Sequence, residues 1–285
     1  MTIPPAPSTD PSAPLAGRTI LMSGGSRGIG LAIALRAAGQ GANIALMAKT
    51  AQTHASLEGT VYSASKQIVA AGGHALPIVG DVRNDDDVAR AVAATVETFG
   101  GIDAVVNNAS AIDLSNTDDV SMRRYDLMQD INVRGAFLLS KLSLPALRRS
   151  PQAHILTLSP PLNLDPKWAG AHLAYTMAKY GMSLTTLGLA EELRIEGIGV
   201  NSLWPATLID TAAIRNLPGG ERLATASRSP RIVADAAVAI LARPPAECTG
   251  NFFTDEEVLR DEGIEDFSGY GLGAREDQLV ADIFL

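Results

Sequence analysis

The 285-residue sequence has one cysteine, few aromatic residues, no excess of basic residues and no long apolar run. The single cysteine, Cys248, excludes an internal disulfide bond and is typical of a reducing compartment, so we expect a cytoplasmic protein. The 23 basic residues are outnumbered by 31 acidic ones, and this net charge of −8 argues against nucleic-acid partners and against an anionic membrane surface. No segment reaches the roughly 18 apolar residues that a membrane-spanning helix requires. No metal site is expected either.

Apolar residues make up 46% of the chain, although aromatic residues make up only 5%. The core must therefore be built from alanine, valine, isoleucine and leucine, which suits helices packed on a parallel sheet. Near-continuous apolar segments alternate with segments of helical spacing, and right-handed crossovers between such strands produce a doubly wound sheet. We therefore predict one α/β domain with a doubly wound, Rossmann-type parallel sheet. The predicted strands are 18–23, 43–48, 74–79, 102–106, 153–158, 198–204 and 251–254, and the predicted helices are 28–38, 61–71, 85–99, 121–147, 171–195 and 230–242.

A glycine-rich turn joins the first predicted strand to the first predicted helix. It contains Gly24, Gly28 and Gly30 in the spacing G-xxx-G-x-G. Glycines at such a turn let bare backbone N–H groups approach a phosphate, and the helix N-terminus adds a partial positive charge there. The motif therefore favours dinucleotide binding. Taken alone, it also fits a tight turn without a ligand.

Three regions are expected along the chain. Residues 1–16, rich in proline, serine and alanine, have neither the basic start nor the apolar centre of a signal peptide and are predicted to be a disordered leader. Residues 17–255 are predicted to form the dinucleotide-binding domain, and residues 256–285 a C-terminal extension packed on it. Within the domain, residues 206–229 lack a strong period, which is typical of a lid or substrate loop.

Tyr175 and Lys179 are four residues apart on the helix predicted over residues 171–195, so they lie on one face. A phenol ordinarily loses its proton near pH 10. A neighbouring ammonium stabilises the phenolate and lowers that pKa, which makes such a pair a proton donor and acceptor for a carbonyl or an alcohol. A simple contact on a helix surface is the alternative for the pair alone.

In their order and spacing, these motifs resemble those of the short-chain dehydrogenase/reductase family. The resemblance is carried by the glycine-rich turn SGGSRGIG at 23–30, Asp81-Val82 after the third strand, NNAS at 107–110, Asn132, and the Tyr175–Lys179 pair. Segments 48–52, 158–164, 174–183 and 249–252 resemble one subgroup of that family more closely. The resemblance implies cofactor contacts from Ser23, Gly24, Ser26, Arg27, Gly28, Ile29, Gly30, Lys49, Asp81, Val82, Asn108, Ala109, Tyr175, Lys179 and Pro205.

The resemblance also implies a mechanism and an assembly. A hydride passes between nicotinamide C4 and a carbonyl carbon, while Tyr175 passes the proton. Lys179 lowers the pKa of that phenol and binds the nicotinamide ribose, and Asn132 helps to hold a water that relays protons to Lys179. The helices over 121–147 and 171–195 resemble those through which family members associate, so we expect a homotetramer or homodimer.

The sequence departs from the family where a catalytic serine is usual. The pair after the fifth strand reads Ser159-Pro160, which places proline at the usual serine position. Three alternatives follow. Ser159 rotates into the catalytic role, Asn163 donates to the substrate oxygen instead, or the site works more slowly with Tyr175 and Lys179 alone.

The charges around the second strand favour NADP(H) over NAD(H). Enzymes that bind NAD usually end this strand with a carboxylate that holds the ribose hydroxyls. Here Ala48 and Lys49 occupy that end, and Arg27 lies within the glycine-rich turn. Two cations at the place of a 2′-phosphate favour the phosphorylated cofactor.

We therefore expect an NADP(H)-dependent oxidoreductase that acts on an apolar ketone or secondary alcohol. One alternative is an NADP(H)-binding sensor or scaffold with weak or lost catalysis, which Pro160 motivates, and another is a dehydratase or epimerase. Several side chains are candidates for the substrate pocket. These are Leu162, Leu164, Trp168, Met182, Trp204 and His172.

Overall fold

The computed structural model describes residues 13–52, 59–217 and 219–285. Most of the expected leader, residues 1–12, lies outside the described residues. Residues 13–16 form a turn in which Leu15 is buried against the core, so packing begins just before the first strand.

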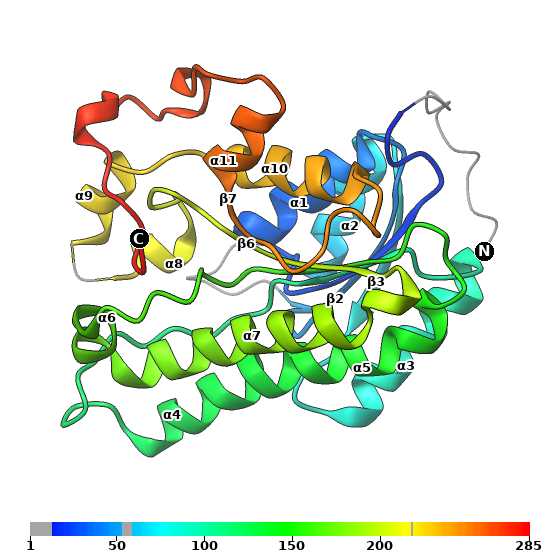
Figure 1. Ribbon diagram of the computed structural model, residues 1–285, viewed down its shortest axis with the longest axis horizontal. Coiled ribbons are helices and arrows are strands. Elements are labelled where there is room, and N and C mark those ends of the chain that lie inside the picture. The colour runs from blue at the N-terminus through cyan, green and yellow to red at the C-terminus, as the bar shows by residue number, and fades with distance from the viewer. Residues whose placement is uncertain (1–12, 53–58, 218) are drawn as a thin grey trace.

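One sheet of seven parallel strands forms the centre of the molecule (Figure 1). Its strand order is β3-β2-β1-β4-β5-β6-β7, so the direction of winding reverses between β1 and β4. Ligands bind at such a switch point, beyond the carboxyl ends of the strands. The predicted doubly wound α/β fold is confirmed. The strands are β1 Thr19–Ser23, β2 Asn43–Ala48, β3 His74–Val79, β4 Ala104–Asn107, β5 His154–Thr157, β6 Gly199–Trp204 and β7 Phe252–Thr254.

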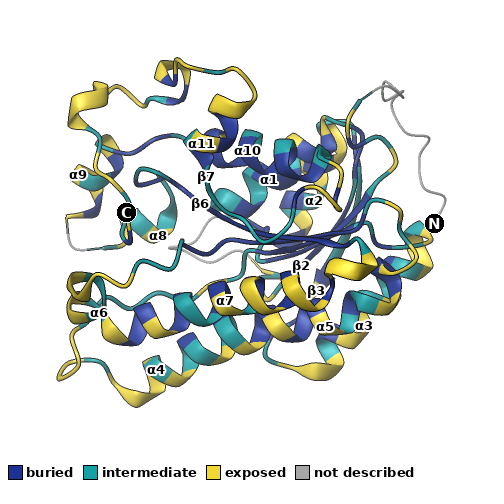
Figure 2. Ribbon diagram, viewed as in Figure 1, coloured by how far each residue is buried: buried dark blue, intermediate teal, exposed yellow. Residues whose placement is uncertain are grey.

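Helices cover both faces of the sheet (Figure 1). Helices α1, α2, α10 and α11 bury one face, and α3, α5 and α7 bury the other, each over its own apolar cluster (Figure 2). The principal helices are α1 Gly28–Ala38, α2 Val61–Ala70, α3 Asp85–Phe99, α4 Met122–Met128, α5 Gly135–Leu147, α7 Leu173–Glu192, α10 Arg231–Ala242 and α11 Asp255–Asp261. Three short helices, α6 Pro166–Ala171, α8 Ala212–Arg215 and α9 Gly220–Thr225, lie toward one end of the sheet.

The long helix predicted over residues 121–147 is interrupted. A π-helical segment, Gln129–Arg134, joins α4 to α5, and Asn132 lies within it. Such insertions are rare and are found mostly at functional sites. Pro145 lies inside the last turn of α5, which ends two residues later. In the aperiodic segment 206–229, the described residues form two helices, the short α8 and α9.

The C-terminal segment returns to the carboxyl ends of the strands (Figure 1). Val280 and Asp282 exchange backbone hydrogen bonds with the segment that follows β6. Leu208 N donates to Val280 O at 2.9 Å, and Asp282 N donates to Ala206 O at 3.1 Å. The chain therefore ends beside the loops that follow the central strands.

Candidate active site

The glycine-rich turn between β1 and α1 is fastened to the end of β4. Gly24 has a φ of 75°, and a Cβ built on it would lie 2.7 Å from the Cα of Ala109. The Asn108 side chain donates to the carbonyls of Ser23 and Gly24 at 3.2 and 2.8 Å. Ala109 N donates to the Ser23 hydroxyl at 3.2 Å. The glycine therefore permits a close approach that fixes both loops at the switch point.

The N-terminus of α1 has no side-chain cap. Its N-cap residue, Arg27, accepts no hydrogen bond from the first turn, whereas Thr60 and Asn84 cap α2 and α3. Free N–H groups at a helix start are a binding site for anions. A cavity of about 550 Å³ lies in front of this turn, and Gly24, Ser26, Arg27, Gly28, Ile29, Asp81, Val82, Asn108 and Ala109 are among its lining residues. The residues present therefore fit a dinucleotide phosphate.

Two basic side chains, Arg27 and Lys49, line the end of this cavity that lies beside β2. Lys49 forms an ion pair with Asp81 at 3.1 Å, and Arg83 contacts the same carboxylate at 2.6 Å. Hydrogen bonds from Arg83, followed by those from Lys49, hold the pKa of Asp81 far below its usual range. Arg27 reaches over the end of β2 and donates to Thr50 Oγ1 at 3.2 Å. The cation pair that the sequence indicated therefore lies along one wall of the cavity.

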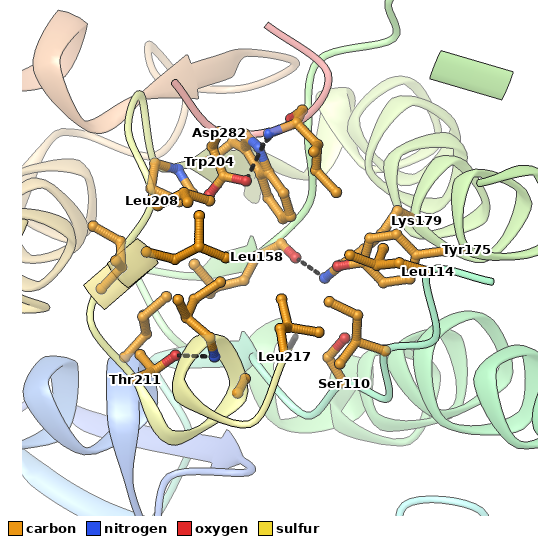
Figure 3. Close-up of a pocket in the computed structure, with 18 of the residues that line it drawn as sticks. Ser110, Leu114, Leu158, Tyr175, Lys179, Trp204, Leu208, Thr211, Leu217 and Asp282 are labelled. Atoms are coloured by element: carbon orange, nitrogen blue, oxygen red, sulfur yellow. Dashed lines mark hydrogen bonds between the residues drawn. The ribbon is translucent and has the colours of Figure 1, made fainter. Parts of the chain in front are cut away.

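Tyr175 and Lys179 lie on the buried face of α7 and line a second cavity of about 340 Å³ (Figure 3). Lys179 Nζ donates to the carbonyl of Leu158 at 2.8 Å and lies 5.0 Å from the ring centroid of Trp204. The two cavities share Ile29 and other lining residues, so they lie side by side. Pro205 lines the second cavity.

Burial sets the protonation of this pair. It raises the pKa of Tyr175, and it lowers the pKa of Lys179 to about 7. Desolvation of the phenolate thus outweighs the lowering by Lys179 that was expected from the sequence. The phenol consequently keeps its proton at neutral pH, which suits donation to a carbonyl.

Asn132 is fully buried in the π-helical segment. Its Oδ1 accepts a hydrogen bond from Ala111 N at 2.7 Å, and its Nδ2 donates to Ala111 O at 3.0 Å. These bonds fix the chain after β4, which lines the first cavity. Asn132 therefore acts on the site through this backbone segment.

Comparison with known proteins agrees with this geometry. The model of the short chain dehydrogenase family matches residues 18–221. The chain belongs to the short-chain dehydrogenase/reductase family. Hydroxysteroid dehydrogenase-like protein 2 of Xenopus tropicalis is 53% identical over 271 residues, which cover 95% of this chain and 64% of the relative. The human protein of that name is 52% identical over 258 residues, which cover 90% of this chain and 61% of the relative.

This chain therefore spans just under two thirds of those relatives. Two crystal structures match it over nearly their whole length. One, of a protein from Xanthomonas campestris, has a TM-score of 0.91 at 53% identity and covers 95% of this chain and 98% of its own. The other, a short chain dehydrogenase from Mycobacterium thermoresistibile, has a TM-score of 0.88 at 51% identity, with 95% of each chain covered. The predicted family and subgroup are both confirmed.

The serine next to the family's usual position faces away from the cavity. Ser159 is fully buried, and its hydroxyl is 2.8 Å from that of Ser202 on β6, which itself bonds to Thr186 on α7. Ser159, one of the three alternatives, lines neither cavity, because its side chain belongs to a hydroxyl cluster between β6 and α7. Asn163, the other candidate, donates to Phe284 O at 3.2 Å and does not line the cavity.

The walls of the substrate cavity differ from the candidates chosen on the sequence. Trp204 lines it, but the other candidates do not. Leu164 is 84% exposed, and His172 holds the carbonyl of Leu114 at 2.8 Å. The apolar walls come instead from four segments far apart in sequence. Their side chains are Ile112, Leu114, Leu158, Leu208, Ile209, Ile214, Leu217, Leu223, Val280 and Ile283.

The C-terminal tail, defined here as residues 279–285, completes this cavity, a role that no local pattern in the sequence indicates. Phe284 is 1% exposed and lies beneath the Tyr175 ring, with 6.1 Å between ring centroids and 26° between planes. Trp204 Nε1 donates to Ile283 O at 3.0 Å. Asp282 lines the cavity (Figure 3), and burial raises its pKa to about 7. A carboxyl group therefore shares the cavity with the tyrosine and the lysine.

Among the described residues, no helix has both the length and the apolar character needed to cross a membrane. Within the same residues, no group of three or more histidine, cysteine, aspartate or glutamate side chains is arranged to hold a metal ion.

Proposed function

We propose that this protein is an NADP(H)-dependent oxidoreductase that interconverts an apolar ketone and a secondary alcohol. The observation that carries the proposal is that two cavities lie side by side and share lining residues. One begins at the uncapped start of α1, and the other ends at Tyr175 and Lys179. A dinucleotide laid across them extends from an anion-binding turn to a proton donor.

The residues of the site divide the work of the reaction. The N–H groups at the start of α1 hold the phosphates, and Lys179 binds the nicotinamide ribose. When bound, the nicotinamide supplies or accepts the hydride. Tyr175, whose pKa burial raises, delivers its proton to the carbonyl oxygen and then recovers one from solvent.

The preference for NADP(H) rests on the charges at the end of β2. Ala48 offers no carboxylate to the ribose hydroxyls, and Arg27 and Lys49 line the same cavity. Asp81, the nearby carboxylate, already accepts charge-assisted hydrogen bonds from Arg83. A 2′-phosphate beside two cations binds more tightly than a hydroxyl.

The substrate class follows from the walls of the second cavity. Apolar side chains from the segments after β4, β5 and β6 and from the C-terminal tail form most of its surface. Such a pocket takes an apolar body and orients it through a few polar groups. We therefore assign an apolar carbonyl compound or secondary alcohol.

Fluorescence titration and turnover test this proposal. NADPH is expected to bind, and the bound cofactor is expected to be oxidised in a single turnover by at least one member of a panel of apolar ketones. Tyr175→Phe retains binding but loses about 10²- to 10⁴-fold in rate, the usual contribution of a positioned acid. Absence of NADPH binding would refute the proposal.

A second candidate function is a cofactor-dependent sensor, and the placement of Ser159 favours it. The Ser159 hydroxyl bonds to Ser202, and Pro160 occupies the usual serine position. Neither residue therefore offers a hydroxyl donor to the cavity. A sensor binds NADPH tightly, shows no turnover over the panel, and is unaffected by Tyr175→Phe.

An assembly through α5 and α7 is part of the proposal. These neighbouring helices expose large apolar side chains, with Phe137 49%, Leu184 57% and Leu187 47% exposed. Contiguous exposed apolar residues mark interfaces. Light scattering is expected to report a dimer or a tetramer, and a monomer contradicts this.

A further inference from the structure

The carboxyl group of Asp282 lies in the wall of the substrate cavity (Figure 3). Its backbone N–H is held by the carbonyl of Ala206 at 3.1 Å, which fixes its position. One carboxyl oxygen accepts a hydrogen bond from Ile283 N at 2.7 Å. The other oxygen has no hydrogen-bond partner among the described residues. It is therefore free to meet a group that enters the cavity.

The ionisable groups around Asp282 come from two helices. Tyr175 and Lys179 face it from α7, and Asp255 faces it from α11. Lys179 and Asp282, both among the described residues, form no direct ion pair. Burial raises the pKa of Asp282 to about 7, since it outweighs the opposing charge of Lys179. A large fraction of these carboxyl groups is thus protonated at neutral pH, and a protonated carboxyl is a hydrogen-bond donor.

Tyr175 has no hydrogen-bond partner among the described residues, whereas each of the other polar side chains that line the cavity makes at least one hydrogen bond. Lys179 donates to Leu158 O. Asn108 donates to two carbonyls of the glycine-rich turn, and Thr211 caps α8. The Ser110 hydroxyl is directed to the carbonyl of Ala111 at 3.4 Å. Ser159 faces the hydroxyl cluster and therefore supplies no second donor to the cavity.

We propose that Asp282 is a catalytic residue whose protonated carboxyl donates a hydrogen bond to the substrate oxygen. The inference rests on the proposed function. As the carbonyl carbon gains the hydride, the electron pair of its C=O bond moves to oxygen, and the proton of Tyr175 forms the new O–H bond. Asp282 keeps its own proton throughout and stabilises the charge developing on that oxygen. Tyr175 then takes a proton from solvent.

Two substitutions separate this role from a structural one. Asp282→Ala removes the donor and is expected to lower kcat/KM for ketone reduction about 100-fold, the usual effect of losing one such donor. Asp282→Asn keeps an N–H donor of the same shape and is expected to retain activity within about tenfold of wild type. NADPH affinity and melting temperature, measured for both, are expected to be unchanged. Asp277→Asn, an exposed carboxylate that pairs with Arg275, is the matched control.

The pH profile provides a second readout. In the wild type, kcat/KM for reduction is expected to fall above pH 7 as Asp282 loses its proton. In Asp282→Asn this fall disappears, because an amide does not titrate. If Lys179 were responsible, the fall would move to lower pH, because the Asp282 charge raises the pKa of Lys179. A fall of kcat/KM that moves to lower pH in Asp282→Asn overturns the inference.

The remaining outcomes are equally decisive. Full activity in Asp282→Ala, or equal losses in the alanine and asparagine variants, overturns the role of Asp282 while leaving the proposed function intact. A wild-type protein that reduces no ketone overturns the proposed function itself.

Discussion

Removing the Phe284 side chain is expected to release the C-terminal tail from the substrate cavity while the sheet stays folded. Phe284 is 1% exposed and packs against the rings of Trp168, Tyr175, Tyr180 and Trp204. Burial of such a side chain contributes about 1.5–3 kcal/mol. In Phe284→Ala this burial free energy is lost from the equilibrium between the docked and the undocked tail, because we expect the tail to separate while the sheet stays folded. The docked population relative to the undocked one falls roughly 10- to 150-fold.

Hydrogen exchange measures this loss directly. The amide of Asp282 bonds to Ala206 O, and that of Val280 bonds to Ala226 O, both at 3.1 Å. Both amides are expected to exchange roughly 10- to 150-fold faster, whereas the amides of β1 and β4 are expected to exchange as in the wild type. Because the tail lines the cavity, kcat/KM falls as well. Leu285→Ala, which removes a side chain that is already 37% exposed, is the control and leaves exchange unchanged. If exchange accelerates equally in the tail and in the sheet, or in neither, Phe284 does not hold the tail on the cavity in the way expected.

Three further predictions concern the cofactor, pH and a buried cation. Arg27→Ala or Lys49→Ala is expected to reduce the ratio of NADPH to NADH affinity about tenfold by titration, since each removes a charge-assisted contact, and an unchanged ratio contradicts this. Burial lowers the pKa of His154 to about 4, so unfolding takes up a proton between pH 6.5 and 4. Stability in urea therefore falls by up to about 1.4 kcal/mol per pH unit as the pH drops through that window, and His154→Asn is expected to remove this slope. Arg228 is 2% exposed and pairs with Glu256, so Arg228→Met is expected to lower the free energy of unfolding by about 3 kcal/mol, and a neutral result contradicts this pairing.

The regular elements of the fold were predictable because their signals are local. The helix at 85–99 begins after Asn84, whose side chain accepts from Asp87 N, and it ends at Gly100 in the left-handed region. Both features are legible in the sequence as cap residues. The π-helical segment Gln129–Arg134 was not predicted, because the apolar residues of 121–147 recur at helical intervals throughout, as they would in an uninterrupted α-helix.

The site was predictable where its residues are close in sequence. The glycine-rich turn lies between β1 and α1, and both Tyr175 and Lys179 lie on α7. The direction of the Ser159 side chain depends instead on Ser202, which is adjacent only once β5 pairs with β6. The contribution of Asp282 depends on a tail that returns from the far end of the chain to the cavity. Tertiary packing, which periodicity does not encode, decides both.

Isotope transfer from the cofactor shows directly whether this protein moves a hydride from NADPH to a ketone. Two samples of NADPH are prepared, each with deuterium in place of one of the two hydrogens at nicotinamide C4. Each is incubated with the protein and a ketone, and the alcohol that forms is analysed by mass spectrometry. We expect one deuterium at the carbinol carbon from one of the two labelled cofactors, and about 10²- to 10⁴-fold slower formation of that labelled alcohol by Tyr175→Phe. An alcohol without deuterium from either cofactor, or no alcohol with any ketone, contradicts the account.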